Sequence, residues 1–320
     1  MAIRSSGEGS RWPALDYSQW RDTAITLQLW TQIVGKTRLA RTPWLNHSWH
    51  VVFYVSARGL TTSPFDVDGE LMEVEFDFVD QVLHIRTSTG QQRQLPLAAQ
   101  SVKAFYKSYL AALGELGFTA RINLVPNEVV PAIPFDADEE HRAYDPEAAH
   151  RFWRALIQAD RVFKRFRTAF LGKSSPVHFF WGSFDLAVTR FSGRKAPPHP
   201  GGVPSLPDAV VREAYSHEVS SAGFWPGSDA FPQAAFYSYA YPEPPGFRDK
   251  SVKPSEASFN TQLGEFILPY DAVRQAEQPD EAVLSFLQST YEAAAEAAQW
   301  DRQTLECSFG ALGRPRHVRA

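Results

Sequence analysis

Apolar residues recur every three or four positions in four segments of the chain, which is the spacing of one buried face of an α-helix. Residues 20–33 form the first segment, and Gly35 follows where a helix would end. Residues 101–116 begin with a serine suited to the N-cap position, residues 145–170 begin with Asp-Pro, and residues 280–299 are rich in alanine. The pattern therefore predicts four helices.

Alternation of apolar and polar side chains predicts β-strands elsewhere. Residues 72–78 alternate most regularly, because acidic residues separate Met, Val and two Phe side chains. Other segments rich in β-branched and aromatic residues are also predicted as strands: 49–55, 82–87, 121–125, 177–184, 186–191, 213–221, 234–240 and 264–268. The predicted fold class is α+β, with mostly antiparallel sheets packed against helices.

A segment rich in proline and acidic residues, 126–146, is the expected boundary inside the chain. A second segment without core-forming residues, 195–207, is predicted as a Pro/Gly loop. We expect four parts: a disordered leader at 1–15, an N-terminal α+β half at 16–135, a C-terminal α+β half sharing the same core at 136–306, and a flexible tail at 307–320.

The order of the predicted elements suggests an internal duplication. Residues 35–37 (Gly-Lys-Thr) follow a helix and precede His50, and residues 172–174 (Gly-Lys-Ser) precede His178 in the same way. Two helix-sheet-helix halves related by a pseudo-twofold would place His50 and His178 at related positions beside a shared cleft. Chance similarity is the alternative, and the sequence leaves both interpretations open.

Neither Gly-Lys triplet has the pattern of a nucleotide-binding loop. A Walker A loop needs a glycine five residues before the Gly-Lys pair, and Trp30 and Arg167 hold those positions. Each triplet also follows a helix instead of joining a strand to one, and the sequence lacks the Gly-x-Gly-x-x-Gly fingerprint. We therefore expect no nucleotide cofactor.

Charge and cysteine content narrow the class of partner and the compartment. Lys and Arg number 32 against 36 Asp and Glu, a formal net charge of −4, so we expect neither nucleic acid nor a membrane surface as a partner. Cys307 is the single cysteine, which excludes an intramolecular disulfide and a Cys-x-x-Cys pair. A cytoplasmic location is expected, since no apolar run approaches the roughly 20 residues that span a bilayer.

Aromatic residues are unusually frequent, with 23 Phe, 11 Tyr and 9 Trp making up 13% of the chain. Rings this abundant line either a core or a ligand pocket. If they line a pocket, Tyr54, Trp181 and Trp225 are its expected walls. Arg190 or Arg194 would then hold an anionic group of the ligand.

Histidines on separate predicted strands are candidates for chemistry. His178 lies in an aromatic run where burial would lower its pKa unless a carboxylate faces it, and His50 lies beside Trp49. His217 and Glu218 lie in a polar strand that precedes an aromatic turn. The alternative for each is a hydrogen-bonded core side chain or a solvated strand residue.

Asp185 is a further candidate, because it lies near the hydroxyl of Ser183 on the strand face opposite His178. Arg190 and Arg194 follow it, so ion pairing is an alternative to catalysis. Ser183 itself lacks the flanking glycines of a nucleophile elbow, and a serine hydrolase is not predicted.

Three segments resemble a bacterial family catalogued only as a domain of unknown function. They are residues 46–51 (Asn-His-Ser-Trp-His-Val), residues 175–187 around Val-His-Phe-Phe-Trp-Gly-Ser-Phe-Asp, and residues 215–218 (Tyr-Ser-His-Glu). The likeness extends from about residue 20 to about residue 305. The resemblance implies a bacterial protein made of a single module, and it transfers no catalytic residue.

The expected function is that of an enzyme acting on a small organic molecule in an aromatic-walled pocket. Its expected acid or base groups are His50, His178, His217, Glu218 and Asp185, and the first four are the expected ligands if a divalent transition metal is bound. A non-catalytic binding protein for a hydrophobic or aromatic small ligand is the alternative, and a structural partner is a third interpretation. The sequence leaves the metal, the substrate, the reaction and the oligomeric state open.

Overall fold

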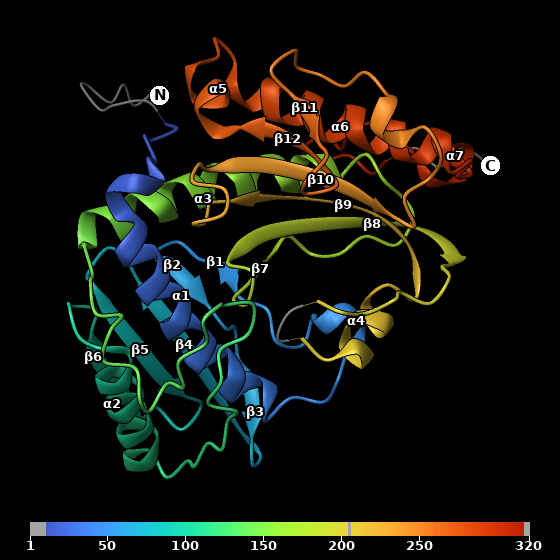
Figure 1. Cartoon of the computed structure of the whole chain (residues 1–320). Helices are drawn as coiled ribbons and strands as arrows, with labels where there is room; N and C mark the ends of the chain where they lie inside the picture. The colour runs from blue at the N-terminus through green and yellow to red at the C-terminus, as the bar shows by residue number, and fades with distance from the viewer. Residues whose placement is uncertain (1–10, 204–205, 317–320) are drawn as a thin grey trace.

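Two antiparallel sheets, with helices between and around them, make up the chain (Figure 1). The computed structural model describes residues 11–203 and 206–316. Residues 1–10 of the predicted leader, 204–205 of the predicted loop and 317–320 of the predicted tail lie outside the described residues. Trp12 and Leu15, at the end of the predicted leader, are buried in the core.

The first sheet is formed by the N-terminal part of the chain, and its strands pair in the order β1-β2-β4-β5-β6, with β3 also paired to β4. All of these pairs are antiparallel. The strands are β1 (Tyr54–Val55), β2 (Gly59–Thr61), β3 (Phe65–Val67), β4 (Glu70–Asp77), β5 (Val82–Thr87) and β6 (Gln92–Pro96).

The second sheet is formed by the C-terminal part, and its strands pair in the order β11-β12-β10-β9-β8-β7. These pairs are antiparallel as well. The strands are β7 (His178–Phe180), β8 (Asp185–Lys195), β9 (His217–Trp225), β10 (Ala235–Tyr241), β11 (Ser258–Asn260) and β12 (Glu265–Pro269). The predicted α+β class with antiparallel sheets is confirmed.

Helix α3 contacts both sheets. It packs against β1 and β2 of the first sheet and against β8 of the second. α6 contacts β9 and β10 of the second sheet. The described helices are α1 (Tyr17–Leu39), η1 (Asn46–Ser48), α2 (Val102–Glu115), α3 (Pro146–Arg167), α4 (Asp208–Ala214), η2 (Phe247–Asp249), α5 (Tyr270–Gln275), α6 (Pro279–Ala297) and α7 (Arg302–Leu305). None of them is both long and apolar enough for a membrane span.

Side-chain caps begin α2 and α3 where the sequence predicts them. Ser101 accepts a hydrogen bond from the backbone N–H of Ala104 at 3.2 Å, and Asp145 accepts from the N–H groups of Glu147 and Ala148. Both caps satisfy N–H groups that have no partner inside the helix. The capping residues in the local sequence therefore determine where both helices begin.

The prediction of a strand at 49–55 is wrong for most of this segment. His47 and Ser48 have positive φ angles of 58° and 55°, a left-handed conformation that turns the chain around η1. A strand forms only where Phe53 exchanges two backbone hydrogen bonds with Phe179, at 2.8 and 2.9 Å, and in β1 directly after it. β-propensity is overridden here by a turn that the composition of the segment does not indicate.

Three other predictions of local structure are wrong. Residues 121–125 form no strand, and the ammonium group of Lys36 in α1 binds two of their backbone carbonyls. The segment predicted as one strand at 213–221 contains the end of α4 and the start of β9. Gly35 does not end α1, because it is the point where the helix meets Trp181: a Cβ on Gly35 would lie 2.3 Å from the indole nitrogen.

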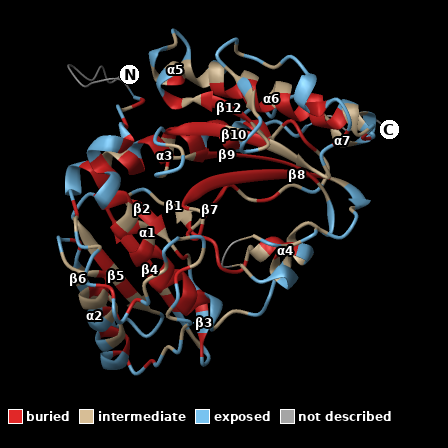
Figure 2. Cartoon of the chain, viewed as in Figure 1, coloured by how far each residue is buried: buried red, intermediate tan, exposed pale blue. Residues whose placement is uncertain are grey.

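One continuous hydrophobic core, rich in aromatic side chains, joins the two sheets. Figure 2 shows the buried residues in both sheets. Phe152 of α3 lies near its centre, with its ring 4.9 Å from Trp20, 5.2 Å from Phe184 and 6.2 Å from Phe179. Much of the aromatic content of the sequence is therefore core. The strand orders of the two sheets differ, and the predicted pseudo-twofold between the halves is not confirmed.

Candidate functional site

The second sheet has one face covered by helices and an opposite face that carries polar side chains. Phe163 of α3 packs on Phe236 of β10, which identifies the covered face. Because side chains alternate along a strand, the neighbours of Phe236 point to the other face. By strand register, that face carries Asp185 and Thr189 of β8, Ser221 of β9, Tyr237 and Tyr239 of β10, and Glu265 of β12.

Asp185 is the most deeply buried acid on this face, with 5% of its surface exposed. Its carboxylate accepts hydrogen bonds from the hydroxyls of Ser183 and Tyr237. Burial raises the pKa of Asp185, and these two hydrogen bonds oppose the rise. Phe184, between Ser183 and Asp185, has a left-handed φ of 62°, so the tight turn before β8 returns the Ser183 hydroxyl to the carboxylate.

Glu128 reaches the same region from the connection between α2 and α3, residues 116–145, which contains no helix or strand. Its carboxylate lies against Gly182, where a Cβ would come within 2.4 Å of the Glu128 Oε1 atom. Glu128 also has a left-handed φ of 57°. The residue as a whole is exposed, but its carboxyl group is enclosed against Gly182. Its pKa is raised to about 7, first by burial of the carboxyl group and then by the negative charge of Asp185.

Glu265 is the third acid, and it is half-buried at the start of β12. Burial and the charge of Asp185 raise its pKa to about 7 as well. Within residues 11–203 and 206–316, neither Glu128 nor Glu265 forms an ion pair with a lysine, arginine or histidine. Two carboxyl groups that titrate near neutral pH therefore lie near one buried aspartate.

Tyrosine hydroxyls surround these acids. The hydroxyls of Tyr215 and Tyr239 are 2.7 Å apart, and the rings of Tyr237 and Tyr239 stack at 6.2 Å. Burial raises the pKa of Tyr215 to about 12 and raises that of Tyr239 well above its usual value, so both hydroxyls are protonated at neutral pH. One of the two donates to the other, which leaves one hydroxyl proton of the pair for another partner. Gly223 makes room for Tyr237, since a Cβ there would lie 2.3 Å from the tyrosine oxygen.

We call the set that these contacts bring together the acid–tyrosine cluster. Its acids come from three separate parts of the chain, and its tyrosines come from β10 and the end of α4. The cluster consists of Glu128, Asp185, Tyr215, Tyr237, Tyr239 and Glu265.

The three histidines predicted as site residues lie in separate surroundings. His178 is fully buried, its Nδ1 lies 2.8 Å from the carbonyl oxygen of Pro176, and burial lowers its pKa to about 3. His50 accepts a hydrogen bond from the N–H of Leu45 at 3.3 Å, and burial lowers its pKa too. His217 is exposed. No hydrogen bond or ring contact joins one of these histidines to another within the part of the chain that the structure describes.

The predicted charged residues form pairs of their own. Glu218 accepts hydrogen bonds from Arg194 at 2.7 and 2.9 Å. Arg190 is buried beneath the rings of Phe166 and Tyr291, whose centroids lie 3.5 and 4.4 Å from the guanidinium carbon. Burial lowers the pKa of Arg190 to about 9, and its side chain packs on the face of the sheet opposite the acid–tyrosine cluster.

The predicted pocket walls make contacts of their own, although Trp225 lies by strand register on the same sheet face as Tyr237. Trp181 donates a hydrogen bond from its indole N–H to the carbonyl of Val51 at 2.9 Å, and Trp225 stacks on Phe231 at 5.8 Å. Tyr54 is half-buried in β1 of the first sheet. Among the residues predicted from the sequence, Asp185 is the one that joins the cluster.

The predicted metal option is not supported. Across the described residues, no group of three or more His, Cys, Asp or Glu side chains is arranged to hold a metal ion. His50, His178, His217 and Glu218 therefore do not form a common ligand set. We assign no cofactor to the site.

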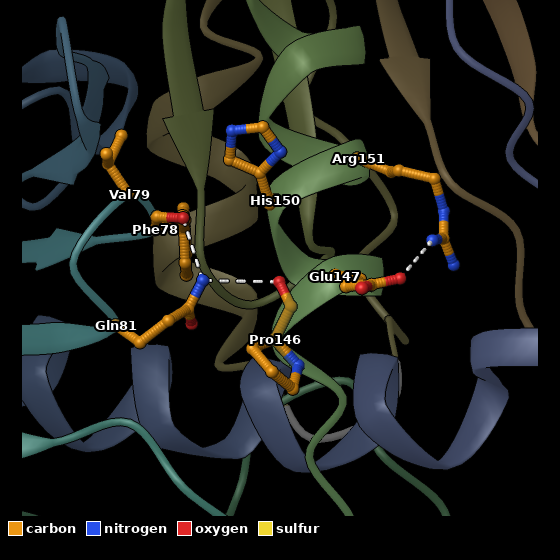
Figure 3. A pocket seen from close by; sticks show the side chains of 7 residues that line it. All are labelled: Phe78, Val79, Gln81, Pro146, Glu147, His150 and Arg151. Carbon is orange, nitrogen blue, oxygen red and sulfur yellow. Dashed lines mark hydrogen bonds and ion pairs between the residues drawn. The ribbon is translucent and has the colours of Figure 1, made fainter.

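A hollow of about 360 Å³ lies elsewhere, between the end of β4 and the first turns of α3 (Figure 3). The polar groups that line it bind one another: the Gln81 amide donates to the carbonyls of Phe78 and Pro146 at 2.8 and 3.2 Å, and Arg151 lies 3.9 Å from Glu147. Apart from His150, whose ring packs on Trp153, its polar groups are paired, and fewer titratable groups meet here than in the cluster.

Two signals in the sequence could have indicated the missed residues. Tyr237, Tyr239 and Tyr241 alternate along one strand, which places three hydroxyl-bearing rings on the same sheet face. Glu128 follows proline and asparagine in a connection rich in acids, where a functional side chain can be held by a rigid scaffold. Glu265 has no comparable signal, because its role depends on the pairing of β12 with β10.

Comparison with known proteins gives a family and no activity. The model of a family of unknown function (DUF5996) matches residues 12–307, which include every member of the acid–tyrosine cluster. No curated protein and no solved structure matches the chain. Since the match covers nearly its whole length, the chain belongs to the DUF5996 family.

Proposed function

We propose that the protein is an enzyme that acts on a small organic molecule by general acid–base catalysis at the acid–tyrosine cluster. The observation that carries the proposal is the convergence of three carboxyl groups and three tyrosine side chains on the uncovered face of the second sheet. Close approaches at Gly182 and Gly223 support it, because each glycine leaves room for a cluster side chain.

The two glutamates suit proton transfer. A general acid or base works best when its pKa lies near the working pH, and Glu128 and Glu265 both have values of about 7. Each interacts with the charge of Asp185, which disfavours ionisation of both glutamates. One protonated and one ionised glutamate could then donate and accept protons in the same turnover.

Asp185 and the tyrosines would have different roles. Asp185 is held by Ser183 and Tyr237, and its negative charge adds to the burial that raises the pKa of both glutamates. Tyr215 and Tyr239 present neutral hydroxyls that can bind a polar group of the substrate.

The charge of the cluster favours a neutral or cationic substrate. Three acids with no paired cation repel an anion, whereas an amine or a hydroxyl compound would be attracted or tolerated. This replaces the earlier expectation of an arginine-held anionic group, since Arg190 and Arg194 lie away from the cluster. The single cysteine is consistent with work in the reducing cytosol.

The experiment is a comparison of turnover and binding. A panel of amines, alcohols and carboxylates is tested for stabilisation of the purified protein against heat, and each stabilising compound is followed for conversion by NMR. We expect hits among amines or alcohols, turnover with a pH optimum near neutrality, and at least a hundredfold loss in Glu128→Gln or Glu265→Gln. Glu277→Gln is the control, because this exposed side chain makes no ion pair or hydrogen bond with another described residue. Wild-type turnover in both cluster variants would refute the proposal.

Non-catalytic binding of an aromatic ligand is the second candidate function. It is favoured by the stacked rings of Tyr237 and Tyr239 and of His199 and Tyr215, the latter 5.0 Å apart. A binding protein would hold its ligand unchanged, and the two glutamine substitutions would alter its affinity without any conversion to lose.

A further inference from the structure

α1 buries a stripe of polar side chains on one face. Gln28, Gln32 and Lys36 are spaced four residues apart, so they lie above one another along the helix. Gln32 is fully buried and Lys36 is 3% exposed. Buried polar groups are costly unless each one finds a hydrogen-bond partner, so their partners should explain why the stripe is there.

All three side chains bind backbone groups of the two segments that enclose the carboxylate of Glu128. Gln28 donates to the carbonyl of Gly182 at 2.6 Å, the residue against which that carboxylate lies. The ammonium group of Lys36 donates to the carbonyls of Asn123 and Val125 in the α2–α3 connection. The stripe therefore fixes both sides of the glutamate.

Gln32 has the most direct effect. Its amide N–H donates to the carbonyl of Asn127 at 2.8 Å, and its amide oxygen accepts from the N–H of Asn127 at 2.8 Å. Both backbone groups of the residue before Glu128 are thus occupied by one buried side chain. The connection contains no helix or strand, so no ladder of backbone hydrogen bonds could replace this anchor.

Glu128 also needs an anchor for a conformational reason. Its φ of 57° is uncommon for a residue other than glycine, and such a conformation persists only when the surroundings determine it. A peptide held on both sides by Gln32 supplies that constraint immediately before the strained residue.

We infer that Gln32 is a positioning residue, which holds the backbone of Asn127 so that the carboxyl group of Glu128 stays against Gly182 and near Asp185. The inference rests on the proposed function in that Glu128 is the group being positioned. It predicts that loosening the anchor lets the carboxyl group leave Gly182 and Asp185, so that the surroundings that raise its pKa are lost.

The test is a carbon-13 NMR titration of the glutamate side-chain carboxyls. The signal of Glu128 is assigned by its disappearance in Glu128→Gln, and its midpoint in the wild-type protein is expected near 7. Gln32→Met keeps the size of the side chain and removes both hydrogen bonds, so we expect the midpoint to fall toward 4.5. Thr31→Val is the matched control, because Thr31 is also buried on α1 but bonds only to the carbonyl of Gln28 within the helix, at 2.8 Å.

Two results would overturn the inference. One is an unchanged Glu128 midpoint in folded Gln32→Met. If that variant does not fold, hydrogen exchange in the wild-type protein decides, since the Asn127 amide should be protected at least a hundredfold and an unprotected amide would contradict the anchor.

The outcome also separates this inference from the proposed function. A midpoint that moves while no compound is ever converted would support the positioning role and count against catalysis. A midpoint that stays fixed while Glu128→Gln abolishes turnover would support catalysis and remove the role of Gln32.

Discussion

Replacing Glu265 with glutamine should make the protein more stable at alkaline pH. The side chain is half-buried at the start of β12, near the negative charge of Asp185, and within the described residues it has no cationic partner. Glutamine has almost the same shape and cannot ionise. The substitution therefore removes the repulsion of an ionised Glu265 without opening a cavity.

The structure sets the size and the sign of the effect. A rise in pKa from 4.5 to about 7 corresponds to about 3 kcal/mol between the two protonation states. Because Glu265 is partly exposed, screening by water reduces this figure, and we expect about 1–2 kcal/mol. The folded pKa is raised, so the stability from protonated Glu265 is complete below pH 4.5 and is lost as the pH rises through 7.

The assay is urea unfolding followed by tryptophan fluorescence at pH 5 and pH 8. Relative to wild type, Glu265→Gln should gain about 1–2 kcal/mol in free energy of unfolding between pH 5 and pH 8. The exposed control Glu277→Gln should show no such difference. A Glu265→Gln protein that is destabilised equally at both pH values would show that the carboxyl is not held in a repulsive environment, and the account of the cluster would fail.

Three further predictions concern the contacts around the cluster and the buried histidine. Tyr237→Phe removes a hydroxyl that donates to Asp185 and should lower the free energy of unfolding by about 1–2 kcal/mol, measured in urea; no change would mean that the hydrogen bond contributes nothing. Gly223→Ala places a Cβ 2.3 Å from the Tyr237 oxygen and should cost about 1–3 kcal/mol, seen as a lower Tm; a wild-type Tm would show that the ring moves freely. Burial lowers the pKa of His178 to about 3, so its contribution to stability is present above pH 6.5 and is lost as the pH falls. In His178→Gln, the free energy of unfolding should therefore fall by about 2–4 kcal/mol less on acidification than in wild type, as followed by circular dichroism. An equally large fall in both proteins would contradict a neutral buried imidazole.

Elements with local signals could be predicted from the sequence. The start of α3 follows from Asp145 and Pro146, which cap the helix and set its first turn, and the alternation in 72–78 corresponds to β4. These signals act over a few residues and need no knowledge of the rest of the chain. The α+β class follows from them.

Elements determined by distant contacts could not be predicted in this way. The segment 121–125 has the composition of a strand, but its carbonyls are bound by Lys36 of α1, and the chain stays irregular there. Likewise, α1 continues past Gly35 because the missing side chain makes room for Trp181, a residue far away in the sequence. In both cases the partner lies in another part of the fold.

The histidine site predicted from the sequence and the proposed acid–tyrosine cluster differ for a reason that burial explains. Removing a titratable group from water disfavours its charged form, so burial lowers the pKa of a histidine and raises that of a carboxylic acid. In this protein it moves His178 from 6.5 to about 3, away from neutrality, and Glu128 and Glu265 from 4.5 to about 7, toward it. We therefore propose Glu128 and Glu265, and not the buried His178, as the groups that exchange protons near neutral pH. A search for histidines, which exchange protons near pH 7 in water, therefore does not find acids whose pKa burial brings into that range.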